Sequence, residues 1–179
     1  HNVETSTIIH RNVRMHIRNL PILYLPYLAH PDWSVRRRSG FLAPSFVVNS
    51  DLGLTAFIPY YHVIDDTRDI EFTPYRYQHR GNALKTRYRQ YWDNSELNAA
   101  IYTASVETYK KNRELVAAVD ANYAARIGNG WNFNMRVNRA SQDTFMRRYK
   151  FDSSTSLKSE VVAEKLDTKR YYLSLIHIS

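Results

Sequence analysis

Apolar and polar residues alternate along much of the chain with a period of two. In residues 131–138, Trp131, Phe133, Met135 and Val137 alternate with Asn132, Asn134, Arg136 and Asn138. In residues 114–127, one parity carries Leu115, Ala117, Val119, Ala121, Tyr123, Ala125 and Ile127, and the other carries Glu114, Asp120, Asn122 and Arg126. This period is typical of a β-strand with two unlike faces. Residues 114–126 are rich in alanine, but their charges do not gather on one helical face, so a strand is favoured.

Turn-forming sequences separate these segments at fairly even spacing. They lie at 49–53, 65–69, 79–82, 93–96, 110–114 and 127–130, with a longer one at 141–156. The segments between them have roughly ten residues, the length of a tilted strand that crosses a membrane. Strands in soluble proteins are usually a little shorter. The spacing therefore predicts successive antiparallel hairpins and an all-β fold.

The first 28 residues lack this long alternation. The stretches STIIH, VRMHIR and ILYLPYL predict short strands joined by Arg-Asn steps, as at the end of a soluble β-domain. Residues 29–40, AHPDWSVRRRSG, are rich in proline and arginine and predict a linker.

Two consecutive predicted strands each contain a proline, in the stretch FLAPSFVVNSDLGLTAFIPYYHVID at 41–65. Pro44 and Pro59 have no N–H for a strand ladder, and proline is normally kept out of strand interiors. Either a strand edge or bulge tolerates them, or weak pairing at this place has a function.

Composition narrows the classes of partner. The chain has 179 residues and a net charge of +8, with an isoelectric point of about 9.7. A basic chain suits an anionic partner, such as nucleic acid, acidic lipid or anionic glycan. The mean hydropathy of −0.53 and the lack of a run of about 18 apolar residues argue against a membrane helix. They do not argue against a membrane β-barrel, where every second residue faces lipid. The 14 tyrosines suit a membrane interface and an ordinary β-sandwich alike.

The chain carries no pattern of catalytic or metal-binding residues. It has no cysteine, no HExxH spacing among seven histidines, no G-x-S-x-G and no phosphate-binding glycine loop. Asp65, Asp66 and Asp69 lack the glycine and distal glutamate of a calcium loop, so we expect them to be turn residues that accept local N–H groups. We predict a protein that is not an enzyme and needs no cofactor or metal.

Several motifs, in order, resemble the family of lipopolysaccharide-assembly outer-membrane proteins LptD, also called OstA or Imp. They are Tyr24–Tyr27, the basic run Arg36–Arg38 before Ser39–Pro44, Pro59–Tyr61, Asp69–Tyr75, Arg80–Gly81 and Arg87–Tyr88. The resemblance is close over residues 11–92 and weaker beyond, although SQDTFMRRYKFD resembles an extracellular loop of the family. Residues 174–179 do not fit it. They resemble translated adapter sequence, and the alternative is an ordinary apolar strand.

The resemblance implies a fold and a location. Residues 1–28 would be the C-terminal strands of a periplasmic β-jellyroll, 29–40 a linker, and 41–173 the first strands of a large transmembrane β-barrel in the Gram-negative outer membrane. The fragment would be an incomplete, open sheet. If the chain enters the first strand at Gly40 from the periplasm, the longest turn, 141–156, falls outside and every inside turn is short. Outer-membrane barrels have this asymmetry.

The resemblance also suggests four groups of functional residues. Pro44 and Pro59 would form a lateral gate. Lys85, Arg87 and Arg89, which alternate with Leu84, Thr86 and Tyr88, would offer positive charge to anions in the barrel lumen, unless they simply pair with Asp69 and Glu71. Arg36, Arg37 and Arg38 would contact lipid head groups or form a solvated hinge. Ile9, Met15, Ile17, Leu23 and Leu25 would line a jellyroll groove for acyl chains or form ordinary sandwich core.

The function implied is insertion of lipopolysaccharide into the outer leaflet through a hydrated lumen and a lateral gate. The partners implied are lipopolysaccharide, membrane lipid, a plug lipoprotein like LptE and a periplasmic bridge protein like LptA, with no nucleic acid. Two alternatives remain open at this point. One is a generic outer-membrane porin or receptor barrel, and the other is a soluble basic β-protein that binds nucleic acid.

Overall fold

The structure is almost entirely β. The computed structural model describes residues 7–17, 20–31, 37–107, 113–142, 144–151, 158–167 and 170–178. In these residues a two-stranded sheet joins β1 (Thr7–Ile17) to β2 (Leu20–Pro31), and a second, larger sheet holds the other strands. The all-β antiparallel class predicted from the alternation is confirmed.

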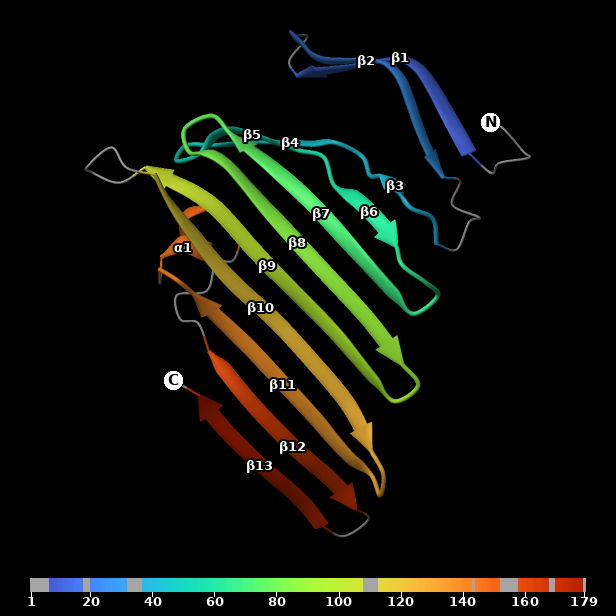
Figure 1. Ribbon diagram of the computed structural model, residues 1–179, viewed down its shortest axis with the longest axis vertical. Coiled ribbons are helices and arrows are strands. Elements are labelled where there is room, and N and C mark those ends of the chain that lie inside the picture. The colour runs from blue at the N-terminus through green and yellow to red at the C-terminus, as the bar shows by residue number, and fades with distance from the viewer. Residues whose placement is uncertain are drawn as a thin grey trace.

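The larger sheet has eleven strands and stays open at both edges (Figure 1). Its first strands are short: β3 (Gly40–Phe41), β4 (Ser45–Asn49), β5 (Gly53–Phe57) and β6 (Tyr60–Val63). The longer ones are β7 (Arg68–Tyr77), β8 (Gly81–Trp92), β9 (Ser95–Glu107), β10 (Arg113–Ile127), β11 (Trp131–Ala140), β12 (Ser159–Asp167) and β13 (Arg170–Ile178). From β7 to β13 each strand pairs with the next one in the chain, so the sheet is a meander.

The N-terminal hairpin corrects one prediction. Three short strands were expected in the first 28 residues, but β1 and β2 are two long strands that pair over nearly their whole length. The first Arg-Asn step lies inside β1, where Asn12 has a positive φ of 56°. The pairing skips Asn12, and the hydroxyl of Tyr24 on β2 donates to its side-chain oxygen at 2.7 Å. This step is therefore a local irregularity within one strand.

The turns of the larger sheet fall where the sequence predicts them. The connections at 64–67, 93–94 and 128–130 lie at one end of the sheet, the short-turn end. Those at 50–52, 78–80 and 141–151 lie at the other, the long-loop end. Gly53 closes the first of these with a φ of +69°, and a Cβ there would lie 2.6 Å from the Oε1 of Gln78. Only glycine fits this backbone and this approach.

The strand register places the odd-numbered and the even-numbered residues of each strand on opposite faces of the sheet. Asp69, Thr73 and Tyr77 of β7 lie opposite Arg89, Lys85 and Gly81 of β8, and this face continues through Ala100 and Tyr102 of β9. We call it the polar face. The apolar face carries exposed hydrophobic side chains: Val48, Leu54, Phe72, Leu84, Ile101, Leu115 and Ile127. The face assignments predicted for 84–89, 114–127 and 131–138 are confirmed.

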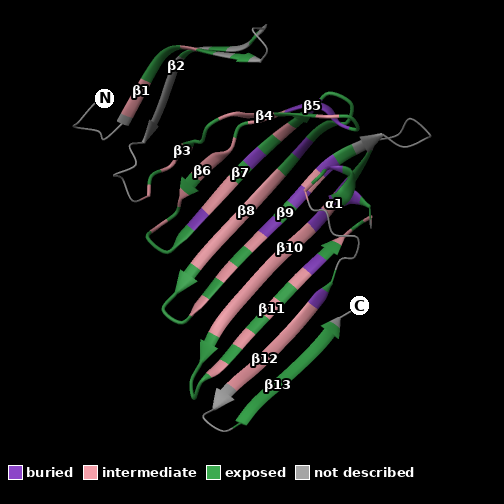
Figure 2. Ribbon diagram, turned by 180° about the vertical axis from the view of Figure 1, so that it is seen from behind, coloured by how far each residue is buried: buried purple, intermediate pink, exposed green. Residues whose placement is uncertain are grey.

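A short helix, which the sequence analysis did not predict, covers the polar face at the long-loop end. Helix α1 (Phe145–Arg148) lies in the connection between β11 and β12. Its apolar side packs into a buried cluster made of Leu52, Tyr77, Ala83, Ala100, Tyr102, Ala104, Val116, Ala118, Phe145, Met146 and Tyr149. Figure 2 shows the buried positions gathered where α1 lies over the strands. Elsewhere the sheet is a single layer whose described residues are mostly half-buried or exposed, with Asp69 on β7 as a buried exception.

Candidate functional site: a broken pair of strands beside a basic face

The first two strands of the larger sheet are both interrupted halfway along. The last β3–β6 pair is Phe41 with Tyr60, and the first β4–β5 pair is Ser45 with Phe57. Between these pairs, three residues of the first strand face two of the second. One extra residue on one strand is a β-bulge, which bends the strand and leaves part of the ladder unpaired.

Pro44 and Pro59 both lie inside this break. Neither has an N–H, so neither can donate across the pair. The N–H of Leu42 donates to the carbonyl of Pro59 at 2.8 Å, which satisfies that acceptor. The break therefore has fewer ladder bonds than a continuous pair of strands would have.

A third proline lies at the same level. β6 continues the register of β5 against β7, which places Ile58 opposite Pro74. Extending the β4–β5 pairing by one residue places Pro44 opposite Ile58 as well. Pro44, Pro59 and Pro74, here called the proline band, therefore remove donors from three successive strands within one residue of the same level. The place of Pro74 beside the break could not be predicted from the sequence, because it depends on the register between strands.

The basic residues of β8 lie on the polar face, directly across from β7. Arg89 lies opposite Asp69, and its Nε donates to the Asp69 Oδ1 at 2.7 Å. The ammonium of Lys85 lies 5.6 Å from the ring centre of Tyr102 on the other neighbouring strand, within the range of a cation–π interaction. Arg89 therefore pairs with an acidic residue of the adjacent strand, which is the alternative given above to a contact with a bound anion. Contacts of Lys85, Arg87 and Arg89 with anions stay a prediction.

One linker arginine is tied to the sheet. The guanidinium of Arg37 bonds to the carboxylate of Asp69 and to the carbonyl of Asp66, and its Nε donates to the Tyr61 hydroxyl at 3.3 Å. The same hydroxyl donates to Asp69 Oδ2 at 3.1 Å. The hydrogen bond with Tyr61 and the charge of Asp69 raise the pKa of Arg37 above its ordinary value.

Asp69 is the centre of this cluster, with a side chain that is only 3% exposed. A buried carboxylate is tolerated when it is paired and hydrogen-bonded, and here Arg37, Arg89 and Tyr61 supply both. The prediction that Asp69 is a turn residue is wrong, because it lies on β7. Arg38 is exposed, and Arg36 lies outside the described residues. Contacts of the linker arginines with lipid head groups stay a prediction.

Asp65 shows the local hydrogen bonding that was predicted for these aspartates. Its Oδ1 accepts the N–H groups of Thr67 and Arg68 at 2.9 and 2.8 Å, and its Oδ2 accepts Nε of Arg68 at 2.7 Å. The bond with the Arg68 side chain, followed by the backbone bond from Thr67, holds the pKa of Asp65 well below its usual range. Asp65 therefore caps the turn between β6 and β7.

The residues predicted to line an acyl-chain groove all lie in the N-terminal hairpin. Ile9 on β1 is half-buried. Met15 pairs in register with Leu23, and Val13 with Leu25. Ile17 is the last residue of β1. The side chains of Met15, Ile17, Leu23 and Leu25 lie outside the described part of the structure, so the groove stays a prediction.

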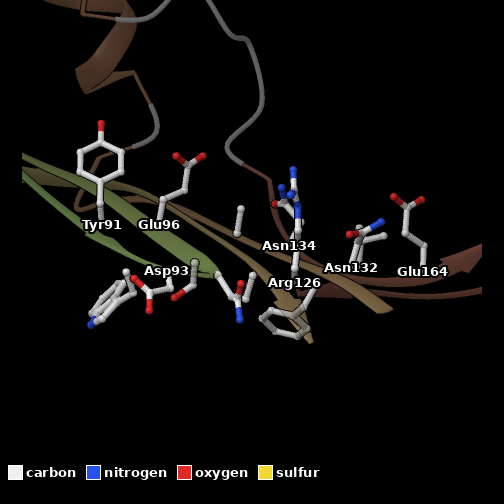
Figure 3. A pocket seen from close by; sticks show the side chains of 14 residues that line it. Tyr91, Asp93, Glu96, Arg126, Asn132, Asn134 and Glu164 are labelled. Carbon is white, nitrogen blue, oxygen red and sulfur yellow. The ribbon is translucent and has the colours of Figure 1, made fainter. Parts of the chain in front are cut away.

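A polar hollow of about 470 Å³ lies at the short-turn end of the polar face. Figure 3 shows Tyr91, Glu96, Arg126, Asn132, Asn134 and Glu164 standing on one side of the strands, with Asp93 on the other. Ala124 lies between Glu96 on one neighbouring strand and Asn134 on the other. Because alanine is small, the hollow opens there. This hollow was not predicted from the sequence, because its lining comes from five strands, β8 to β12.

The described residues hold neither a metal-binding cluster nor a membrane-spanning helix. No group of three or more histidines and acidic residues in the described ranges could hold a metal ion. No helix within those ranges is long and apolar enough to cross a membrane.

These features define a class of protein. It is an antiparallel all-β protein whose hairpin-linked strands separate a polar, partly basic face from an apolar one, with its first two strands broken at prolines. A sequence profile of the family described as "LptD protein" matches residues 8–175. The chain belongs to this family.

Curated relatives agree with the family assignment. Each of the following is named LPS-assembly protein LptD. The protein of Chromobacterium violaceum is 31% identical over 141 residues, which cover 79% of this chain and 18% of the relative. That of Pseudoalteromonas translucida is 29% identical over 168 residues, 93% of this chain and 21% of the relative. That of Shewanella frigidimarina is 40% identical over 78 residues, 44% of this chain and 10% of the relative. The chain thus spans about a fifth or less of the length of these relatives.

Proposed function

We propose that this chain is part of an outer-membrane protein that assembles lipopolysaccharide (LPS) at the cell surface of a Gram-negative bacterium. The family and the names of the relatives support a role in LPS assembly. In this proposal, β1 and β2 end a periplasmic jellyroll, and β3 to β13 are the opening strands of a transmembrane barrel. The role is binding and transport, without catalysis.

The observation that carries the proposal is the division of the sheet into two unlike faces. Strands β7 to β11 have 10 to 15 residues each, long enough to cross a bilayer when tilted. Along them, most side chains on one face are apolar, and several are exposed, as Leu115 is at 72%. A soluble protein would cover such a face or keep it small. In a barrel wall it would face lipid, and the polar face would line a hydrated lumen.

Aromatic side chains on the apolar face add support. A row at the short-turn end consists of Trp92, Tyr123, Phe133, Trp131 and Tyr172. The rings of Trp92 and Tyr123 are 6.3 Å apart, as are those of Trp131 and Tyr172. Outer-membrane barrels carry girdles of aromatic residues at the membrane interfaces, where rings are buried and polar atoms are wet. This row would mark the periplasmic interface.

The path of the lipid follows from these elements. Acyl chains would leave the jellyroll near Ile9, and the glycan would cross the lumen past Lys85, Arg87 and Arg89. The molecule would then leave sideways between the first strand and the last strand of the complete barrel. In lipid every backbone group must be paired, so the proline band would make the first strands easier to separate than the rest of the wall. The partners would be LPS, membrane lipid, a plug lipoprotein like LptE and a periplasmic bridge protein like LptA.

The two alternatives from the sequence fit less well. The function of a porin does not explain three prolines close together in the first strands. The function of a soluble nucleic-acid-binding protein does not explain an exposed apolar face. The proline band and the apolar face therefore favour transport of an amphiphile.

Photo-crosslinking in cells tests the proposal. A photoreactive residue replaces Phe46, beside the proline band, in the full-length protein, and the matched control replaces Val137 on β11, far from the break. Transport through the gate predicts LPS adducts at position 46 and few at position 137. Clean absence of adducts at position 46, with normal protein levels, would contradict the transport proposal and favour a porin.

A further inference from the structure

A second basic cluster lies at the long-loop end of the sheet, away from Asp69 and the broken strands. A hollow of about 540 Å³ is lined by Asp51, Arg80, Thr144, Arg147, Arg148 and Lys150. These residues come from three connections that are far apart in the chain: the β4–β5 turn, the β7–β8 turn and the segment around α1. Folding therefore gathers four cations around one opening, with a single carboxylate beside them.

Most of this positive charge is not neutralised within the described residues. Lys150 pairs with Asp51 at 3.5 Å, with both side chains more than half exposed, and such exposed pairs are weak. Among the residues that the structure describes, none forms an ion pair with Arg80, Arg147 or Arg148. All three arginines are exposed. Like charges held together repel each other, so an arriving anion would relieve this repulsion.

The arginines are displayed by a fixed backbone. Phe145, Met146 and Tyr149, on the other side of the α1 segment, are each at most 2% exposed. The ring of Tyr149 lies 5.3 Å from that of Tyr77, and the N–H of Phe151 donates to the carbonyl of Met146 at 3.0 Å. Because the buried side anchors the segment, Arg147 and Arg148 project from its outer side without first having to be ordered. Preorganised donors lose less free energy on binding than mobile ones.

The chemistry of the cluster selects the ligand. The guanidinium of arginine is a planar fork that matches the oxygens of phosphate, and it stays charged at all physiological pH values. The hollow adjoins the polar face, at the end that would face outward in the proposed orientation. Resting on the proposed function, the ligand would therefore be a phosphorylated glycolipid that has reached the outer mouth of the lumen.

We propose that Arg80, Arg147, Arg148 and Lys150 form a binding site for the phosphate groups of an anionic glycolipid. The site would hold the head group at the outer mouth while the acyl chains leave through the wall. Since it uses charge-assisted hydrogen bonds at an exposed position, its affinity falls as salt concentration rises.

Binding is tested with the full-length protein in detergent. The probes are lipid A, which is a bis-phosphorylated disaccharide lipid, its dephosphorylated form, and inorganic phosphate. The test variant is R147Q/R148Q, with R80Q as an independent second variant. The matched control is R126Q/R136Q, which removes two arginines from the polar face, far from the hollow at the long-loop end. Circular dichroism confirms that each variant is folded.

We expect R147Q/R148Q to bind lipid A about tenfold more weakly or worse, since hydrogen bonds to charged groups are the strong ones. R80Q should weaken binding in the same direction, and R126Q/R136Q should not. Dephosphorylated lipid A should bind equally to the wild type and to R147Q/R148Q. Equal affinity of all variants for lipid A, or no dependence on its phosphates, would overturn the site.

One further outcome separates this site from the proposed function. If the wild type binds inorganic phosphate, R147Q/R148Q does not, and lipid A does not compete, then the anion site stands but its assignment to a glycolipid is wrong. In contrast, loss of lipid A binding in R147Q/R148Q with unchanged LPS levels at the cell surface would keep the site and contradict its role in export.

Discussion

Arg37 in the linker pairs with Asp69 on β7, 32 residues further along the chain. This pair connects the linker before the larger sheet to β7. Asp69 also binds Arg89 of β8, so the carboxylate joins the linker and two strands. The N-terminal side of the broken pair is thereby anchored. Ser39 adds to this, because its hydroxyl accepts the N–H of Val63 at 2.8 Å.

We predict that Arg37→Gln lowers the free energy of unfolding of the full-length protein by about 2 kcal/mol, because it removes charge-assisted hydrogen bonds from a buried carboxylate. Equilibrium unfolding by denaturant measures this. The control is Arg136→Gln, whose ion pair with Glu160 at 3.5 Å is partly exposed, at 55% and 33%, and should contribute less than about 1 kcal/mol. Equal effects of both substitutions would mean that the Arg37–Asp69 pair does not anchor the linker.

The proline band leads to a second prediction. Pro44→Ala with Pro59→Ala should restore two N–H donors, strengthen pairing at the seam and slow LPS export. Adding Pro74→Ala should enhance the effect, because this residue lies at the same level of the next strand. Surface LPS and permeability to large antibiotics are the measurements. Pro26→Ala in β2 is the control, because it replaces an exposed strand proline outside the larger sheet. Wild-type values in the triple variant would rule out the gate.

The aromatic residues of the α1 segment, at the long-loop end, lead to a third prediction. Tyr149 is 2% exposed, and Tyr149→Ala removes its ring contacts with Tyr77, Phe145 and Phe151. Truncating a buried aromatic residue typically costs about 3–5 kcal/mol. We expect the α1 segment to detach and to become sensitive to protease. Arg147→Ala, on the exposed side of α1, should leave the digestion pattern unchanged, and a resistant Tyr149→Ala protein would show that other contacts hold the segment.

Two glycines with similar backbones offer a fourth prediction. Gly53 and Gly81 have φ values of +69° and +75°, but only at Gly53 would a Cβ meet another residue, Gln78. Both alanine substitutions carry the left-handed backbone cost of roughly 1–2 kcal/mol, and Gly53→Ala adds a steric clash. The unfolding midpoint should therefore fall further for Gly53→Ala. Equal midpoints would mean that Gln78 moves aside without cost.

The pKa of Asp65 predicts a pH dependence. Its folded-state value lies below the ordinary value, so the unfolded chain binds a proton more readily than the folded one. The contribution of Asp65 is therefore fully present above about pH 4, the ordinary value for aspartate, and is lost as the pH falls further. Unfolding measured between pH 7 and pH 3 should show a steeper loss for the wild type than for Asp65→Asn. Parallel curves would contradict this role.

The sequence alone predicted most of the fold, because period-two alternation and turn residues are local signals. The hairpins from β7 to β11 lie where alternation and turns indicate them, and the alanine-rich β10 is a strand because its charges follow a period of two. The N-terminal hairpin differs from the prediction, since the step at Asn12 is bridged by β2. A local sequence pattern does not reveal such a partner strand.

The alternation, the positions of the turns and the two prolines of the first strands are therefore properties of the sequence by itself. Only the tertiary structure decided that Pro74 lies level with the break, because that depends on register between three strands. It also decided that Asp69 binds Arg37, and that Tyr149 docks on Tyr77, 72 residues away. These contacts join segments that are distant in the chain. They are stabilised by burial of aromatic surface and by pairing of a buried charge, and both of these require that the sheet has already formed.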